Sequence, residues 1–489
     1  MLSAIFLVLG SVVANAGPVD TFGFGAAAVG RGHGGVAIPD GGLTVFRNPA
    51  LLQGLDWAEV SVGYTVNRSA FAQSPPVYWD TNQDGAIDDL DAPLVLAAET
   101  GRADGMTLGI ARNMGNRIGL ALNLFLPTDE FLRLRTTEPA LPTWVMHGNR
   151  AKRVEIGVGI GVELFEGISV GFGTELQSQA RYRIHGTLDM AAGAGDGDAE
   201  DLGDLIEYVR MDVHEMTLDL VPQYVPVAGL HWDVGKLNPT LNGLQFGLSW
   251  RGAGGIPVVA DIDLQINGSL NDLGELDPIG IALVIPVKFS IFDHFVPERW
   301  SFGAAYQHKR LPRFYMDVHH TRWSEMEVNV AHVTESAIRS QIFQVEEDLL
   351  IDANQFDTVF KNTLSVNAGV EVFLPDMASS SPFGVLSPVL RGGFGYIPSP
   401  LVSQDARTAF LDADRLLLSG GFGLSHADPW GLVPGPVSWD IFYSRQQLAK
   451  GALQVPESDT PRAGAPVDGA AIPIAGHLWS AGLQFSVSF

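Results

Sequence analysis

The chain contains 489 residues, of which 46% are hydrophobic and 17% charged, and its formal net charge is −25. This acidic balance excludes a nucleic-acid-binding protein, because nucleic-acid affinity needs a basic surface. The chain has no cysteine, which excludes disulfides, thiolate metal sites and a cysteine nucleophile. No uncharged apolar run reaches the about 18 residues that a membrane helix needs. The hydrophobic residues must therefore be spread along the chain in another pattern.

The N-terminus has the features of an export signal. An apolar segment over residues 2–13 is followed by the small-x-small tripeptide Ala-Asn-Ala at 14–16. We therefore predict a signal peptide over 1–16 and a mature protein that leaves the cytoplasm. The alternative is a buried N-terminal helix, which the Gly-Pro pair at 17–18 disfavours.

Most of the remaining chain alternates with period two. Residues 154–164 place Val, Ile and Leu on one face and Glu or Gly on the other. Such alternation predicts a strand with one apolar face and one polar or small face. The C-terminal segment 479–489 follows the same rule and ends on Phe489, as in the signal that outer-membrane insertion machinery reads. The pattern recurs at 106–112, 118–126, 168–176, 364–374 and 416–424.

The connections between these strands differ sharply in length. Short turns are predicted at 115–116 and 166–167, whereas long acidic, Gly-rich or Pro-rich stretches are expected as loops at 68–104, 127–151, 186–209, 324–361, 398–413 and 448–475. Tight turns that alternate with long loops are typical of outer-membrane barrels. A soluble β-sandwich would explain the alternation, but not the loop asymmetry, the signal peptide and the terminal aromatic together.

The sequence therefore predicts an all-β fold, a transmembrane antiparallel β-barrel. In hydrocarbon every backbone polar group must be paired, and a closed sheet does this without leaving an edge. We expect about fourteen strands, an even number that leaves both ends of the barrel on one side. This count treats 280–308 as one interrupted strand and 253–279 as the long loop before it.

Four segments of the chain carry recognisable motifs. The first is a Gly-rich opening over 20–37 that contains a G-R-G-x-G-G-type turn, and the second is the N-P-A tripeptide at 48–50. The third is a D-x-x-x-T-x-W-S strand within 314–324, and the fourth is an R-x-G-x-x-Y-x-x-S-P segment at 391–400. Together these segments span most of the chain and resemble the FadL family of outer-membrane transporters for hydrophobic compounds. Departures from the family are the long first loop and extra residues at 292–299.

The resemblance implies a fourteen-stranded barrel whose lumen is plugged by an N-terminal hatch, here residues 17–56, with the barrel over 57–489. It implies an outer-membrane channel that captures long-chain fatty acids or aromatic hydrocarbons and releases them sideways into membrane lipid. Release occurs where a strand kinks toward the N-P-A motif. We expect a monomer that is not an enzyme. The hatch and gating residues implied in this way are Gly30, Arg31, Gly35, Asn48, Pro49 and Ala50.

Two features of the hatch can be read physically. Pro49 lacks a backbone N–H, and the amide of Asn48 could satisfy hydrogen-bonding groups that a broken strand ladder leaves open. The alternative is a plain Asn-Pro turn leading into the first strand. Arg31 and Arg47 could pair with wall carboxylates or with a fatty-acid head group, and the acidic lumen face favours wall pairing.

The predicted first loop, 68–104, contains a calcium-like signature. Carboxylate and amide oxygens recur at the spacing of a Ca²⁺ loop, and Gly85 would make its sharp turn. The last position is Asp rather than the Glu of EF-hands, which is similar to dockerin-type loops. The alternative is a solvated acidic turn. We expect a structural Ca²⁺ that does no chemistry, with ligands Asp80, Asn82, Asp84, Ala86 (through its carbonyl), Asp88 and Asp91.

Two enzyme-like matches and one histidine pair fail on their context, so no catalytic residue is predicted. The G-x-S-x-G at 167–171 begins a continuing strand rather than a strand-to-helix turn. The loose G-x-G-x-x-A at 23–28 belongs to no βαβ unit. His319 and His320 lie on opposite faces of a strand and cannot share a metal. A non-transporting barrel that binds a partner through its loops is the alternative function, and a barrel-embedded hydrolase is a third for which no convincing triad is found.

Overall fold

The computed structural model describes most of the chain. The described residues are 11–12, 18–55, 58–81, 87–88, 90–98, 100–115, 117–129, 136–137, 142–144, 146–147, 153–192, 206–270, 279–308, 311–325, 332–340, 345–348, 360–378, 385–402, 410–427, 435–455 and 465–489. The predicted signal peptide falls largely outside these residues. Only its Ser11–Val12 (β1) is described, paired with Thr136–Thr137 (β6), so cleavage stays a prediction.

Fourteen strands form the wall of a closed antiparallel barrel. Each strand pairs with the next one in the following order, and β26 pairs back with β2. This confirms the predicted fold class. The strands are β2 (Glu59–Phe71), β4 (Gly105–Met114), β5 (Ile118–Pro127), β8 (Glu155–Phe165), β9 (Ile168–Ala192), β10 (Ile206–Asp233), β11 (Leu244–Arg251), β14 (Arg299–Tyr306), β15 (Arg313–Thr321), β18 (Thr363–Phe373), β20 (Val385–Ile397), β22 (Arg415–Ala427), β23 (Pro436–Leu448) and β26 (Gly476–Ser488).

The segment between β11 and β14 differs from the prediction. It forms a long antiparallel hairpin of β12 (Gly254–Leu270) and β13 (Ile279–Val296), not a loop followed by one interrupted strand. β11 pairs directly with β14, so this hairpin lies outside the wall. The predicted total was correct, but the assignment of 253–308 was wrong, because alternation cannot separate a wall strand from a strand that projects beyond the wall.

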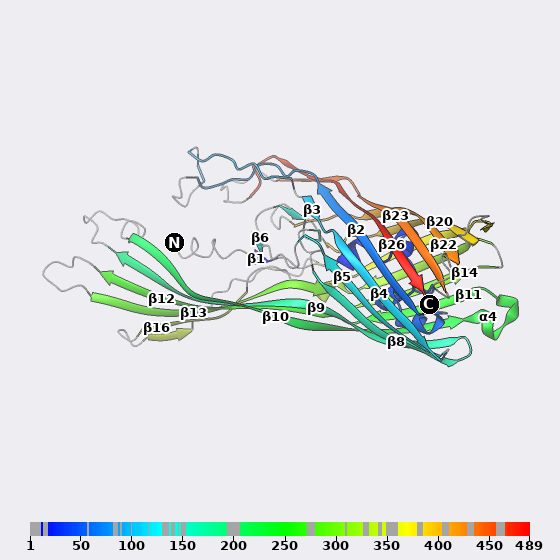
Figure 1. Ribbon diagram of the computed structural model, residues 1–489. Helices are drawn as coiled ribbons and strands as arrows, with labels where there is room; N and C mark the ends of the chain where they lie inside the picture. Colours follow the sequence, from blue (N-terminus) through cyan, green and yellow to red (C-terminus); the bar gives the residue numbers. More distant parts are fainter. Residues whose placement is uncertain are drawn as a thin grey trace.

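The described parts of the predicted loop 186–209, which are residues 186–192 and 206–209, are strand. β9 has 25 residues and β10 has 28, and they stay paired from Trp232–Ile168 out to Ile206–Ala192. β12 joins the outer half of β9 in parallel, so these strands form an arm that extends past the barrel in Figure 1. Shorter strands at the same end are β3 (Thr100–Arg102), β7 (Thr143–Trp144), β16 (His332–Ser340), β17 (Val345–Asp348), β21 (Phe410–Leu411), β24 (Gly451–Gln454) and β25 (Ala471–Ile474).

The two ends of the barrel have different connections. β4–β5 and β8–β9 are joined by tight turns in which Gly115 and Gly167 have φ of 67° and 80°, a left-handed conformation that favours glycine. Both chain ends of the barrel lie on this side, where Ala58 and Phe489 exchange backbone hydrogen bonds. At this end a two-residue strand, β19 (Met377–Ala378), pairs with β20, and the short helices α4 (Val234–Leu237) and η5 (Pro239–Leu241) join β10 to β11. The long connections, including η6 (Trp323–Glu325), lie at the other end.

The polarity of the wall is the reverse of a soluble protein. Large apolar side chains are exposed on its outer face, whereas polar side chains such as Ser61, Asn123 and Gln484 are buried on the lumen face. Strands that alternate in this way expose an apolar band to lipid. In the part of the chain that the structure describes, no helix is long and apolar enough to cross a membrane. The outer-face residues include Val62, Met106, Ile110, Leu120, Leu122, Val158, Ile160, Phe302, Leu418, Ile441 and Leu483.

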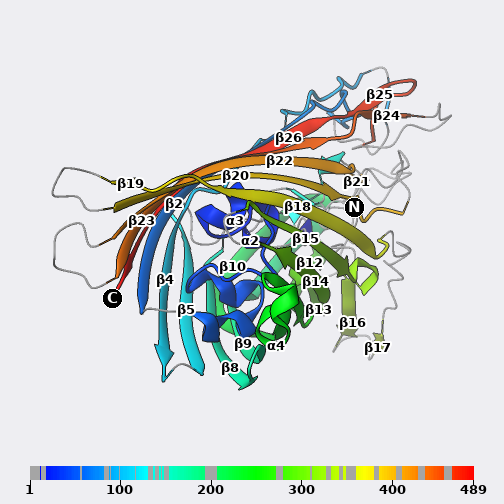
Figure 2. The same ribbon diagram turned by 90° about the vertical axis from the view of Figure 1, so that its right-hand side faces the viewer.

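The N-terminal segment fills the lumen, as Figure 2 shows. It contains two short α-helices, α2 (Pro18–Phe22) and α3 (Ala26–Gly30), and two 3-10 helices, η1 (Leu43–Phe46) and η2 (Pro49–Gly54). Nearly all of its apolar side chains are buried against the wall. This segment corresponds to the expected hatch.

Candidate functional site

Glycines in the wall let the hatch backbone approach the strands directly. A Cβ added to Gly171 of β9 would lie 2.2 Å from both the nitrogen of Ala50 and the carbonyl carbon of Pro49. A Cβ on Gly229 of β10 would lie 1.9 Å from Oδ1 of Asn48. The N-P-A motif therefore packs directly against the glycines on the small-residue face of these strands. A larger side chain at these glycines would push the motif away.

Asn48 is fully buried and ties the hatch to β10. Its Nδ2 donates hydrogen bonds to the carbonyl oxygens of Val36, at 2.8 Å, and Leu230, at 3.1 Å. Its Oδ1 accepts a hydrogen bond from the nitrogen of Ala50, which caps η2, with Pro49 in the first helical position. Beside Leu230 the pairing of β9, β10 and β11 runs without a register shift. The gap that the resemblance implies next to N-P-A is thus not present in these described strands.

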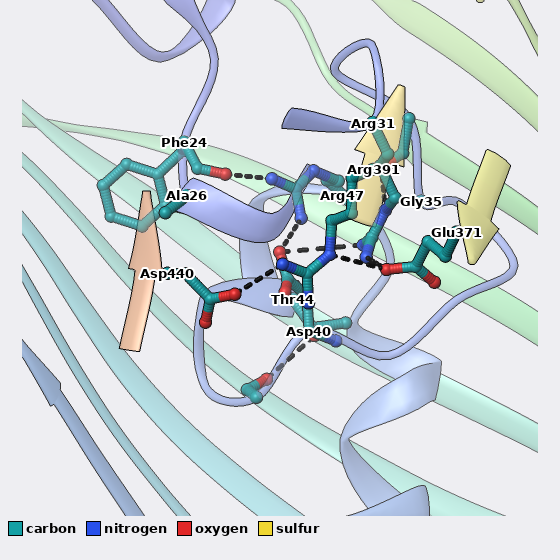
Figure 3. Close-up of polar contacts among 12 residues, drawn as sticks. Phe24, Ala26, Arg31, Gly35, Asp40, Thr44, Arg47, Glu371, Arg391 and Asp440 are labelled. Carbon is teal, nitrogen blue, oxygen red and sulfur yellow. Dashed lines mark hydrogen bonds and ion pairs between the residues drawn. The ribbon is translucent and has the colours of Figure 1, made fainter. Parts of the chain in front are cut away.

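Arg31 pairs with both the wall and the hatch (Figure 3). Its Nη1 lies 3.3 Å from Oε1 of Glu371 on β18, and its Nη2 lies 3.7 Å from Oδ2 of Asp40. Arg47 pairs with Asp40 at 2.9 Å, and among the described residues it forms no ion pair with a wall carboxylate. Burial favours the neutral form of Asp40, but Arg31 and Arg47 outweigh it and hold the pKa of this carboxyl below its ordinary value. Asp40 is therefore a buried carboxylate shared by the two hatch arginines.

Glu371 on β18 is the wall carboxylate that contacts three arginines in this part of the lumen. Besides Arg31, it accepts hydrogen bonds from Arg391 at 2.8 Å and Arg313 at 3.0 Å. Arg391 in turn lies 2.5 Å from Asp440 on β23. These alternating charges connect β15, β18, β20 and β23 to the hatch and fix its position in this part of the lumen.

The two hatch glycines that the resemblance singles out contact the wall. A Cβ on Gly30 would lie 3.0 Å from the Cα of Gly421, and the carbonyl oxygen of Gly30 accepts a hydrogen bond from Ser419 at 3.1 Å. Gly35 has a φ of 143°, which other residues rarely adopt, and its nitrogen donates to Asp317 at 2.6 Å. Gly35 therefore favours glycine because of its backbone conformation, whereas a side chain at Gly30 would require the wall at Gly421 to give way slightly.

A cavity of about 150 Å³ lies in the lumen above the hatch. Its hatch side includes Val19, Phe24, Val36 and Phe46, and its wall side comes from β11, β14, β15, β18, β20 and β22. One part of the lining is apolar, and another carries hydroxyl, imidazole and amide groups. These polar wall residues are Ser301, His319, Thr321, Thr363, Ser365 and Asn367.

Parts of the long connections border the cavity on the long-loop side, and we call their described residues, 142–144, 146–147, 398–402 and 410–414, the lid. β7 and β21 pair in parallel, Trp144 stacks on Phe71 at 4.6 Å, and both belong to a buried apolar cluster that also contains Phe22 of the hatch. The imidazole of His147 lies 3.0 Å from the carboxyl of Asp412, and both side chains are buried. Met146 and Pro398 of the lid face the cavity.

The cavity lining carries four arginines and a single carboxylate among the described residues. Arg251 and Arg299 both bind Asp20 of the hatch, with nitrogen–oxygen distances of 2.8 and 2.7 Å. Arg47 and Arg415 are the other two arginines, and Nε of Arg415 is buried without a hydrogen-bond partner. The lining is therefore cationic as well as apolar.

Sequence reasoning did not single out Asp20, Arg251, Arg299 or Arg415. Asp20 lies within the Gly-rich opening, but no local pattern marks it. Burial favours the neutral form of Asp20, but Arg251 and Arg299 lower its pKa below the ordinary value, so it is ionised. Its partners are 231 and 279 residues away in sequence, a separation that no spacing rule connects.

The predicted calcium loop is described only in part. Asn82, Asp84 and Ala86 lie outside the described residues. Asp91 accepts hydrogen bonds from the nitrogens of Thr81, at 2.7 Å, and Asp88, at 3.0 Å. Among the residues that can be described, no group of three acidic or histidine side chains is arranged to hold a metal. The oxygen-rich donor set suits Ca²⁺ chemically, and Ca²⁺ binding stays a prediction.

Ser169 and the pair His319 and His320, which were considered as enzyme-like or metal-binding positions, lie within regular strands of the wall. Ser169 is fully buried within β9, and its segment continues as a strand rather than turning into a helix. His319 faces the lumen and is 2.8 Å from the hydroxyl of Ser301, while the exposed His320 lies on the other face of β15.

The chain was compared with known proteins. No protein-family model and no curated protein matches it. Among solved structures, a FadL homologue from Pseudomonas aeruginosa aligns with 98% of each chain at 16% identity and a TM-score of 0.51. The deltaS2S3 mutant of the TodX monoaromatic hydrocarbon channel aligns with 96% of this chain and 100% of its own, at 12% identity and a TM-score of 0.50.

The chain has the FadL fold. This FadL-type barrel, with its apolar outer face and plugged lumen, is the architecture of a multi-pass protein of the bacterial outer membrane. One of these two structures is described as a FadL homologue and the other as a monoaromatic hydrocarbon channel.

Proposed function

We propose that the protein is a FadL-type outer-membrane channel for the uptake of hydrophobic molecules. The observation that carries this proposal is the lumen cavity between the hatch and the lid. The wall, floor and roof of this partly apolar, partly cationic cavity come from three separate parts of the chain, which suits a chamber that receives a ligand. Cavities that bind ligands combine apolar surface with a few placed polar groups, as this one does.

The lining favours an amphiphile with a carboxylate over a pure hydrocarbon. Four guanidinium groups border the cavity. Arg47, Arg251 and Arg299 already pair with carboxylates of the hatch, whereas Nε of Arg415 has no hydrogen-bond partner, so a carboxylate head group would add a negative charge to a cationic lining. Phe24, Phe46 and Val36 would contact the hydrocarbon part. A cavity of about 150 Å³ is the size that holds one benzene molecule, so a long-chain fatty acid needs the hatch or the lid to move.

Lateral release into the membrane is the second part of the proposal. The wall beside Asn48 is fully hydrogen-bonded, so release at N-P-A would require local opening of the β9–β10 or β10–β11 pairing. Asn48 supports such opening, because its Nδ2 already donates to the carbonyl oxygen of Leu230 in the wall. The surrounding outer-membrane lipid would receive the ligand. A monomer suffices for this route, since one chain closes the barrel.

A non-transporting scaffold is the second candidate, and one observation favours it. The network around Glu371 fills one side of the lumen with paired charges, which would hold the hatch in place permanently. Under this function the cavity would be a by-product of hatch packing, and the long connections would bind a partner.

Uptake by cells distinguishes these two functions. A deletion strain carrying the wild-type gene should take up labelled dodecanoate faster than the strain without it. Ser365→Trp places an indole in the cavity and should abolish the gain. Leu364→Trp is the matched control, because Leu364 lies on the lipid-facing side of the same strand and is 56% exposed. Equal uptake by the deletion strain and the complemented strain would reject transport, as would the absence of lipophiles in protein purified from native membranes.

A further inference from the structure

A row of arginines crosses the seam at which the barrel closes. The first and last wall strands, β2 and β26, lie side by side there, with β23 next to β26 (Figure 1). Trp479 of β26 is directly opposite Arg68 on β2 and Arg445 on β23, and Arg68 is opposite Arg102 on β3. Residues that lie opposite each other on neighbouring strands point to the same face of a sheet. We call these four residues the arginine row.

The arginine row faces lipid and not the lumen. Arg445 is exposed, whereas Ser444 before it and Gln446 after it are buried on the lumen face. On the same outer face, the ring of Tyr443 lies 6.4 Å from that of Trp479, and aromatic side chains of this kind mark the edge of the apolar band. The row lies at the end of these strands that carries the long connections, which is the extracellular end of an outer-membrane barrel. It is therefore at the level of the lipid head groups of the outer leaflet.

The charge of the row is only partly balanced. Asp104, whose side chain is 2% exposed, accepts a hydrogen bond from Nη2 of Arg68 at 3.1 Å and lies 2.7 Å from Nε of Arg102. Asp129 lies 4.0 Å from the same Nε, a long distance for an ion pair. The side chains of Arg68 and Arg102 are 31% and 58% exposed, so both remain accessible from the membrane.

Arg445 has no acidic partner among the residues that the structure describes. Its Nη2 donates a hydrogen bond to the neutral Oε1 of Gln447 at 3.1 Å. Elsewhere on the same rim, Arg322 pairs with two carboxylates, those of Glu298 and Glu325, both at 2.5 Å. The arginine row thus carries three guanidinium groups against two carboxylates, an excess of positive charge in a chain whose net charge is −25.

The spacing of the row suits a phosphate group. Arg68 and Arg445 flank one strand, and since neighbouring strands are about 4.8 Å apart, their Cα atoms are about 10 Å apart. Two long side chains can converge on one phosphate across that distance, and guanidinium groups bind phosphate through charge-assisted hydrogen bonds. Towards the tight-turn end the same face continues into the exposed Ile441 and Leu483, against which acyl chains can pack. A phosphate-bearing lipid satisfies both parts, whereas a soluble anion uses only the charge.

We propose that the arginine row is a binding site for the phosphate group of a lipid in the outer leaflet, with Trp479 between the two arginines that hold it. The bound lipid bridges β2, β26 and β23, so it joins the first and last strands of the wall from outside. This site is separate from the lumen cavity and goes beyond the proposed uptake function, because none of its residues lines that cavity.

Native mass spectrometry of the full-length protein in detergent micelles measures this binding. The probes are lipid A, a disaccharide lipid that carries phosphate groups, and the same lipid with its phosphates removed. The wild type should bind the phosphorylated probe about tenfold more tightly. Arg445→Gln should weaken binding of this probe about fivefold and leave that of the dephosphorylated probe unchanged, because it removes one charge near the membrane surface. Arg445→Lys keeps that charge and should retain most of the affinity.

Arg322→Gln is the matched control, since it removes an arginine of the same rim that two carboxylates already neutralise, and it should change neither affinity by more than about twofold. Thermal unfolding reports the bridge across the seam. Lipid A should raise the unfolding temperature of the wild type and of Arg322→Gln, and raise that of Arg445→Gln less. An excess of inorganic phosphate should not displace lipid A, because free phosphate lacks the acyl chains.

Three results would overturn the proposal. The first is equal binding of the two probes by the wild type, and the second is an Arg445→Gln variant that binds lipid A as tightly as the wild type. The third is displacement of lipid A by inorganic phosphate, which would show a small-anion site. If Arg445→Gln does not fold, Arg68→Gln must show the same loss, and full affinity in that variant would reject the site. Dodecanoate uptake is measured independently of these results, so this inference and the proposed function fail separately.

Discussion

Replacing Glu371 by Gln tests whether buried charge pairing holds the hatch in the lumen. Glu371 is 3% exposed and contacts Arg31, Arg313 and Arg391 at 3.3, 3.0 and 2.8 Å. Gln preserves the size of the side chain and some of its hydrogen bonds, but it removes the negative charge that the three guanidinium groups share. The barrel itself should still form, because no strand pairing depends on this carboxylate.

The expected loss in the free energy of unfolding is smaller than the sum of the contributions of three ion pairs. Arg31 keeps Asp40 at 3.7 Å, and Arg391 keeps Asp440 at 2.5 Å. Arg313 is 30% exposed and also lies over the ring of Phe373, so water and that ring offset part of its loss. Breaking a buried pair by removing one partner costs 3–5 kcal/mol, and we expect the lower end of that range, about 3 kcal/mol.

Urea unfolding of the protein in lipid vesicles measures this change in the free energy of unfolding. Glu163→Gln is the matched control, because its partner Lys236 is 44% exposed and the pair should contribute less than about 1 kcal/mol. A loss below about 1 kcal/mol for Glu371→Gln, equal to that of the control, would refute the view that this network anchors the hatch.

Four further predictions follow from the same contacts. Gly171→Val should displace the N-P-A motif and make the hatch accessible to protease, whereas an unchanged digestion pattern would contradict the close packing. Arginines lower the pKa values of Asp20 and Asp40, so the ionised carboxylates stabilise the folded protein fully above the ordinary Asp pKa of about 3.9. This stabilisation is lost as the pH falls below that value, and the thermal unfolding temperature should therefore be lower at pH 2 than at pH 5. His147→Ala removes a buried partner of the lid and should raise the rate of dodecanoate entry, which stopped-flow binding would detect. Asp80→Ala should abolish any calorimetric heat of Ca²⁺ binding, and wild-type protein without such heat would end the calcium hypothesis.

The barrel could be predicted from the sequence because its signal is local. In β8 the alternation of Val158 and Ile160 with Gly157, Gly159 and Gly161 already separates the lipid face from the lumen face. The same locality explains the error over 253–308. β12 and β13 alternate like wall strands, and only the direct pairing of β11 with β14 shows that they project beyond the barrel.

The cavity could not be predicted in the same way, because its parts are distant in the sequence. Asp20 and Arg299 are far apart in the sequence, and they are in contact because the closed barrel surrounds the hatch. The partners of Arg31 could be predicted only in part. The acidic lumen face favoured a wall partner, and Glu371 is that partner, but Asp40 and Arg47 complete the arrangement from within the hatch itself.

The close packing of the hatch against glycines of the wall has a consequence for the permeability of the cell envelope. At Gly161, Gly171, Gly229 and Gly393 the plug and the wall touch backbone to backbone or through Asn48, so no film of water fits between them at these positions. Because the diameter of a barrel grows with its number of strands, a fourteen-stranded barrel without a plug would have an open lumen. A plug that touches the wall so closely leaves no continuous path for hydrophilic solutes at these positions, so many copies of the barrel could reside in an outer membrane without weakening its barrier there.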